Sequence, residues 1–88
     1  MVRFKSVPAM FYKEKSGKKP NTLRKKDLAD ERFIQLGAMA AVYEYGTIEI
    51  TNTATGECFR REITDVTTWE DWVIISWKHY ESKFKGGR

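Results

Sequence analysis

The chain has 88 residues, of which 41% are hydrophobic and 32% charged, so it can form one folded domain but is too short for two independent cores. Its one cysteine, Cys58, excludes an internal disulfide framework and a cysteine-rich zinc site, and no apolar run is long enough to span a bilayer. The net charge of +4 is unevenly distributed, because residues 1–26 hold nine of the 16 Lys and Arg but one of the 12 Asp and Glu. Such a concentrated basic segment favours contact with a polyanion.

The same features predict the organisation of the chain. The segment Met1–Lys5 lacks the apolar core of a signal peptide, so we expect a cytoplasmic protein. We expect one domain over residues 1–85 and a flexible end over residues 86–88, with no metal, cofactor or membrane partner.

The N-terminal segment predicts a strand followed by a helix. Val2–Ser6 alternates apolar and polar residues, which is typical of a half-buried strand. Pro8 is tolerated in the first turn of a helix, which we expect over residues 7–16. Gly17 is suited to end that helix, because glycine readily adopts the left-handed conformation of a helix C-cap.

The middle of the chain predicts short elements. Thr22–Lys25 is typical of a short strand. Asp27 is a candidate N-cap for a brief helix or turn through Phe33, which Gly37 ends. Ala38–Tyr45 follows as a predicted strand.

The C-terminal half predicts a sheet. Thr47–Asn52 and Glu57–Thr64 are expected strands, joined by a hairpin loop at Thr53–Gly56. Trp72–Trp77 is apolar at nearly every position, which predicts a central strand buried on both faces, and a last helical turn is expected over residues 78–85. Because a small antiparallel sheet leaves unpaired edges unless it curls, we expect an α+β fold with a five- to six-stranded β-barrel and one or two short helices.

The basic segment brings different chemical groups to one place. Thr22 and Arg24 share a face of the predicted strand, and Lys19 precedes it closely enough to lean over that face. An ammonium, a hydroxyl and a guanidinium would then surround one site, and these groups bind phosphates or base edges. Two plainer interpretations stay open: the lysines form a solvated loop, or Arg24 forms a structural ion pair with Glu44 or Glu62.

The segment Gly17–Arg24 resembles the signature of the ASCH domains, members of the PUA-like superfamily, in which Gly, Lys, Thr or Glu, and Arg follow a short helix. Arg32–Gly37 resembles the stretch that leads into their next strand, although Ala38 stands where they have Asp. Thr55–Thr64 and Trp72–Trp77 resemble the hairpin and closing strand of small phage and bacterial ASCH-like proteins. Together with Glu44-Tyr45, which resembles a recurrent strand end, the matches cover residues 4–77.

The resemblance implies a PUA-like β-barrel that binds RNA or nucleotides in a cleft whose cations are Lys19 and Arg24. Thr22 stands where many relatives have Glu, but a second branch of the superfamily has Thr there. Members of that branch resemble amidohydrolases that act on acetylated cytidine through a Lys, a Thr and a distant Glu. Lys19 and Thr22 match them, and Glu70 is the candidate acid, although the helical insertion that carries the acid is missing from residues 65–71.

Three hypotheses of function follow. The favoured one is binding of RNA or another nucleic acid by a basic cleft. Its expected residues are Lys18, Lys19, Thr22, Arg24, Lys25, Lys26 and Trp69. One alternative is the amidohydrolase with catalytic Lys19, Thr22 and Glu70, and the other is a small phage-type protein that binds and modulates a host protein. The oligomeric state stays open.

The remaining chemically distinctive residues favour structural roles. Trp72 and Trp77 point to opposite faces of one strand, so at least one is expected in the core, whereas Trp69 in the preceding loop is the best candidate for an exposed, base-stacking ring. His79 lacks companions for a metal site and is expected at the surface. Cys58 lacks a neighbouring histidine that would favour a nucleophile.

Overall fold

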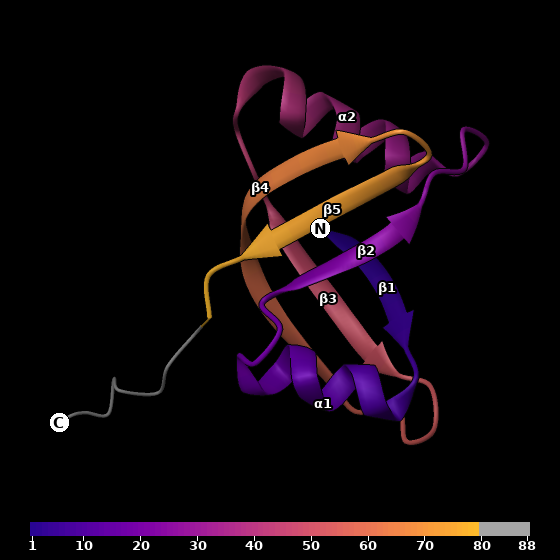
Figure 1. Cartoon of the computed structure of the whole chain (residues 1–88), viewed down its shortest axis with the longest axis vertical. Coiled ribbons are helices and arrows are strands. Elements are labelled where there is room, and N and C mark those ends of the chain that lie inside the picture. Colours follow the sequence, from indigo (N-terminus) through magenta and orange to yellow (C-terminus); the bar gives the residue numbers. More distant parts are fainter. Residues whose placement is uncertain (80–88) are drawn as a thin grey trace, which may run out of the picture.

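A computed structural model describes residues 1–79 as five curled strands and two helices (Figure 1). The elements in chain order are β1 (Val2–Ser6), α1 (Pro8–Ser16), β2 (Asn21–Lys25), α2 (Glu31–Val42), β3 (Thr47–Asn52), β4 (Cys58–Trp69) and β5 (Trp72–Trp77). Helix α1 lies near one end of the curled sheet and α2 near the other. The predicted α+β class and the small barrel-like shape are confirmed.

The strands form one sheet in the order β1-β3-β4-β5-β2. β1 pairs with β3 in parallel, and the other neighbours are antiparallel. The long strand β4 joins the two halves: residues 58–62 pair with β3, whereas residues 63–69 pair with β5 after a register shift between Ile63 and Asp65. An irregularity of this kind bends a strand and increases its twist, so it turns the sheet into a half-barrel.

The core lies on the concave side of the half-barrel. The alternating burial of β1, β3 and β5 points every second residue inward, as expected from the period of a strand. Phe11 of α1 is fully buried and lies 5.3 Å from the ring of Phe59, which lies 6.1 Å from Trp77. The buried apolar residues are Val2, Phe4, Phe11, Leu36, Ile48, Ile50, Phe59, Ile63, Val66, Val73, Ile75 and Trp77.

The first helix and the two strands around it agree with prediction. Pro8 occupies the first turn of α1, and Gly17 at its C-cap has φ of 90°, a left-handed conformation that favours glycine. The predicted strands at Val2–Ser6 and Thr22–Lys25 are present, as is the hairpin after Asn52.

The prediction for residues 27–45 was right about a helix that includes Phe33 but wrong about its bounds and about the strand that follows. Helix α2 begins at Glu31, with Asp30 rather than Asp27 as the N-cap, and it continues through Gly37 to Val42. The predicted strand Ala38–Tyr45 is therefore mostly helix. Gly37 does not end the helix, because an internal glycine costs a helix only about 1 kcal/mol. It is exposed, and a Cβ at this position would meet no atom within 4 Å. 

Two other predictions need correction. Strand β4 runs to Trp69, so Trp69 ends a strand instead of lying in a loop, although it is exposed as expected. Strand β5 is internal, but only its Val73, Ile75 and Trp77 face is fully buried, because neither helix covers the other face. The helical turn expected over residues 78–85 falls largely outside the described residues, and Lys78 belongs to neither a helix nor a strand. The flexible end over residues 86–88 lies outside them entirely.

Candidate functional site

The edge strands β1 and β2 face each other across the open side of the half-barrel without pairing. We call the space between them the seam. Arg24 of β2 spans it: Nη1 donates to the Lys5 carbonyl at 2.8 Å, and Nη2 donates to the Ser6 hydroxyl at 2.9 Å. Its Nε donates to Thr22 Oγ1 at 2.9 Å. A guanidinium has five N–H donors, so two remain for a ligand.

Arg24 is a partly buried cation. Burial lowers its pKa from the ordinary value, whereas the negative charge of Glu14 acts in the opposite direction and the nearby Arg32 lowers it further. Its guanidinium carbon lies 4.8 Å from the centroid of the Phe4 ring, which adds a cation–π contact. An arginine remains charged despite such a shift, so the seam holds a fixed positive charge.

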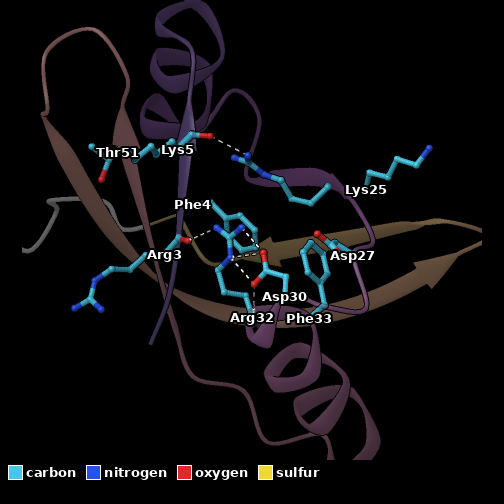
Figure 2. A pocket seen from close by; sticks show the side chains of 10 residues that line it. Arg3, Phe4, Lys5, Lys25, Asp27, Asp30, Arg32, Phe33 and Thr51 are labelled. Atoms are coloured by element: carbon cyan, nitrogen blue, oxygen red, sulfur yellow. Dashed lines mark hydrogen bonds and ion pairs between the residues drawn. The ribbon is translucent and has the colours of Figure 1, made fainter.

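Arg32 forms a second link to β1 from the first turn of α2. Its Nη1 donates to the Arg3 carbonyl at 2.7 Å, and its guanidinium carbon lies 4.3 Å from the Phe4 ring (Figure 2). Asp30 orients it by accepting from its Nε at 3.0 Å. Two guanidiniums thus satisfy carbonyls on the free edge of β1 and both contact Phe4.

A pocket of about 640 Å³ opens at the α2 side of the seam. We call it the α2-side pocket, and Figure 2 shows its lining side chains. Five of these are cations and two are carboxylates, of which Asp30 is already bonded to Arg32. The lining residues are Arg3, Phe4, Lys5, Arg24, Lys25, Asp27, Asp30, Arg32, Phe33 and Thr51.

A second pocket of about 450 Å³, the α1-side pocket, lies across Arg24 from the first. It brings together Lys19, Thr22 and Arg24, the three residues that the sequence placed around one site. Lys5 and Arg24 line both pockets, so the two pockets adjoin along the seam, and we call them together the groove. The other lining residues are Ser6, Val7, Met10, Glu14 and Leu23.

The α1-side pocket also contains a carboxylate that was not predicted. Glu14 of α1 is only 1% exposed, and it accepts a hydrogen bond from the Ser6 hydroxyl at 2.8 Å. The Lys19 ammonium lies 4.0 Å from its other oxygen and donates to the Asn21 carbonyl at 3.0 Å. Glu14, Ser6 and Arg24 therefore form a continuous polar chain at the floor of the groove.

Glu70, the predicted acid, lies elsewhere. It occupies the turn between β4 and β5, and the Lys26 amide donates to the Asp71 carbonyl of the same turn. This contact puts the turn at the opposite end of β2 from Lys19. Glu70 lines neither pocket.

Other predicted site residues are divided between the groove and its surroundings. Lys25 lines the α2-side pocket, whereas Lys18, Lys26 and Trp69 line neither pocket. The three hydrogen bonds of Arg24 go to β1 and to Thr22, not to Glu44 or Glu62.

Four of the groove residues that sequence reasoning missed bear directly on its chemistry: Arg3, Lys5, Arg32 and Glu14. Arg3 and Lys5 lie on β1, and Arg32 lies on α2, so only the fold brings them to the basic segment. Glu14 did have a signal, because it follows Val7, Met10 and Phe11 at the i+7 position of the same predicted helix stripe. A carboxylate on the buried face of a helix indicates a polar partner in the interior.

The carboxylates near the seam predict a pH dependence of stability. The hydrogen bond from Arg32 lowers the pKa of Asp30, and hydrogen bonds from Arg60 and Arg3 contribute to lowering that of Glu49. A lowered pKa in the folded state gives stability that is complete above the unfolded value of about 4 and is lost as the pH falls through the folded values. We expect an Asp30→Asn, Glu49→Gln variant to melt below the wild type at neutral pH, and the difference to shrink below about pH 4. Thermal melts across this range test it, and a difference that is constant with pH would contradict it.

Comparison with known proteins adds no identity: no family model, curated protein or solved structure matches the chain. Within residues 1–79, no three or more His, Cys, Asp and Glu side chains gather as metal ligands. In the same residues, neither helix has the length and apolar character needed to cross a membrane. The geometry of the seam is thus the basis for a functional proposal.

Proposed function

We propose that the seam binds nucleic acid, with phosphates held along the groove between β1 and β2. The observation that carries the proposal is the gathering of six cations in one groove from four separate parts of the chain. These are Arg3, Lys5, Lys19, Arg24, Lys25 and Arg32. Phosphate contacts dominate the affinity of proteins for nucleic acid, and lysine and arginine supply most of them.

The carboxylates of the groove compete weakly with such a ligand. Glu14 is buried and bonded to Ser6, and Asp30 is bonded to Arg32, so both already have partners inside the protein. Lys5 and Lys25 are exposed, and within residues 1–79 neither ammonium has an ion-pair partner. These two lysines are the cations most available to phosphates.

Roles within the groove follow from burial. Lys5 and Lys25 attract the backbone, and the two remaining donors of Arg24 bind a phosphate or a base edge. Thr22 is 3% exposed and faces the α1-side pocket, where its hydroxyl orients Arg24.

The test is the affinity of a single-stranded RNA of about ten nucleotides for charge-matched variants. We expect Lys5→Ala, Lys25→Ala to weaken binding clearly, since it removes two phosphate contacts. The control is Lys13→Ala, Lys78→Ala, which removes the same charge from exposed lysines that line neither pocket. Equal losses of RNA affinity in the two variants would contradict the proposal, because they would reflect net charge alone. A protein partner that copurifies after nuclease treatment, together with no RNA affinity, would favour the host-protein alternative.

We also propose that the half-barrel is PUA-like and that the chain is an ASCH-type protein. The support is the resemblance of Gly17–Arg24 to the ASCH signature together with the position of its Lys19, Thr22 and Arg24 in one pocket. 

A second candidate function is the amidohydrolase activity, now with Glu14 in place of Glu70 as the carboxylate. Glu14 lines the same pocket as Lys19 and Thr22, so an ammonium, a hydroxyl and a carboxylate share one site. Release of acetate from acetylated cytidine by the pure protein, abolished in Thr22→Val, tests it. Absence of turnover removes this candidate.

A further inference from the structure

The outer face of β2, β5 and β4 exposes an apolar patch beside the seam. Strand register places Lys25, Trp72 and Trp69 in one row across the three strands, and Leu23, Ile74 and Thr67 in the next row. Trp69 is 65% exposed, Leu23 51% and Trp72 37%. We call Trp69, Trp72, Ile74 and Leu23 the platform. 

In Figure 1 neither helix crosses the front of β5 and β2. Apolar side chains that are exposed side by side often mark a surface that binds a partner. The rings of Trp69 and Trp72 at one edge of the platform suit a ligand that has a flat, apolar surface of its own.

Lys25 connects the platform with the seam. It lines the α2-side pocket, and its ammonium lies 6.0 Å from the centroid of the Trp72 ring. Neighbouring strands lie about 4.8 Å apart, so the row from Lys25 to Trp69 extends about 10 Å outward from the groove. A chain leaving the groove past Lys25 therefore meets Trp72 first and Trp69 next.

The chemistry of this row fits a single-stranded nucleic acid. Lys25 attracts its phosphates, and the two indole rings offer stacking surfaces to bases that are not paired. A duplex keeps its bases stacked on each other and presents only phosphates here. Glu70 and Asp71 lie in the turn between Trp69 and Trp72, and their negative charges repel phosphates of the nucleic acid directly above that turn. This repulsion favours bases rather than phosphates at Trp69.

We propose that the platform is a base-stacking subsite for single-stranded nucleic acid, in which Trp72 and Trp69 receive bases of the strand whose phosphates occupy the seam. This inference rests on the proposed function and names its ligand class, a strand with unpaired bases. It assigns the specificity for single strands to the platform and the electrostatic affinity to the seam.

Tryptophan fluorescence tests the inference, with a single-stranded oligouridylate and an RNA duplex of the same length as probes. We expect the single strand to quench the emission of the wild type and the duplex to leave it nearly unchanged. Trp77 is 4% exposed, so the emission that remains in a Trp69→Ala, Trp72→Ala variant should not respond to either probe.

Affinities of single variants complete the test. Trp69→Ala should weaken oligouridylate binding about tenfold, Trp69→Phe should retain most of it, and duplex binding should not change in either. The control is Tyr43→Asn, which removes another exposed aromatic, lies in neither pocket and puts a residue that tolerates positive φ at the φ of 56° found there. Because Trp69 ends its strand and is mostly exposed, its single variants keep the test valid if the double variant does not fold.

The outcomes separate the two proposals. If Trp69→Ala binds the single strand like the wild type while Lys5→Ala, Lys25→Ala loses affinity, the platform is overturned and the seam stands. Equal quenching by both probes also overturns the platform. A wild type that forms dimers, and a Trp69→Ala variant that does not, would show that a second copy of the chain covers this face. No affinity of the wild type for either probe overturns the seam as well.

Discussion

Replacing Arg24 by alanine is expected to lower the free energy of unfolding by about 2 to 3 kcal/mol. The reason is that β1 and β2 do not pair, so Arg24 supplies much of the bonding between these edges. The variant loses its hydrogen bonds to the Lys5 carbonyl, the Ser6 hydroxyl and Thr22, and its contact with the Phe4 ring. Hydrogen bonds from a charged donor contribute more than neutral ones, and the partial burial of Arg24 limits their screening by water. Urea unfolding measures the loss.

Lys25→Ala is the control for Arg24, because Lys25 follows it in the same strand and is exposed. We expect this variant to stay within about 0.5 kcal/mol of the wild type. An Arg24→Ala variant as stable as Lys25→Ala would contradict the role of Arg24 across the seam. The expected loss also means that Arg24→Ala is a poor test of ligand binding, which is better carried out at the exposed lysines.

Removal of Glu14 is expected to destabilise the fold by about 3 kcal/mol, because a partly buried cation then loses its counter-charge. The Glu14 charge opposes the effect of burial on Arg24, and its carboxylate accepts from Ser6. Glu14→Ala removes both and leaves a space beneath the groove. Glu14→Gln keeps the side-chain volume and an acceptor for Ser6, so it should lose less stability than Glu14→Ala. The loss that remains in Glu14→Gln reports the contribution of the charge, and the difference between the two variants reports that of packing and of the hydrogen bond.

Glu44→Ala serves as the control for Glu14, since Glu44 is exposed, and it should be nearly neutral. A second check is a double-mutant cycle between Glu14 and Arg24. Because Ser6 bonds both side chains, the two losses should not add, and a coupling of about 1 kcal/mol or more is expected. Additive losses, or a Glu14→Ala variant as stable as Glu44→Ala, would show that the polar chain does not act as a unit.

The fold could be predicted from sequence where local signals were strong. Alternating apolar and polar residues predicted the bounds of β1 and β3 to within about two residues. Gly17 predicted the end of α1 equally well. The prediction failed over Ala38–Tyr45, whose first six residues carry no charge and show no clear hydrophobic period. The alanines and Met39 of this stretch favour a helix, whereas Val42 and the tyrosines favour a strand. The helix forms because it packs Leu36 and Met39 against the core.

The candidate site was predictable only in the part that is local in sequence. Lys19, Thr22 and Arg24 lie within six residues, and strand geometry suffices to bring them together. Arg3 and Arg32 reach the seam through the pairing of β1 with β3 and through the start of α2, neither of which a local pattern contains. Glu70 lies away from Lys19 and Thr22 for a similar reason. Because β4 continues to Trp69, the turn that carries Glu70 lies at the far end of β2.

The salt dependence of RNA affinity tests the central claim most directly. The logarithm of the binding constant falls linearly with the logarithm of salt concentration, with a slope of about −0.7 for each phosphate contact on a single strand. Measured between about 50 and 200 mM salt, the slope of Lys5→Ala, Lys25→Ala should be shallower than that of the wild type by about 1.4. The charge-matched Lys13→Ala, Lys78→Ala variant should keep the wild-type slope. Identical slopes for all three proteins would contradict a phosphate-binding seam.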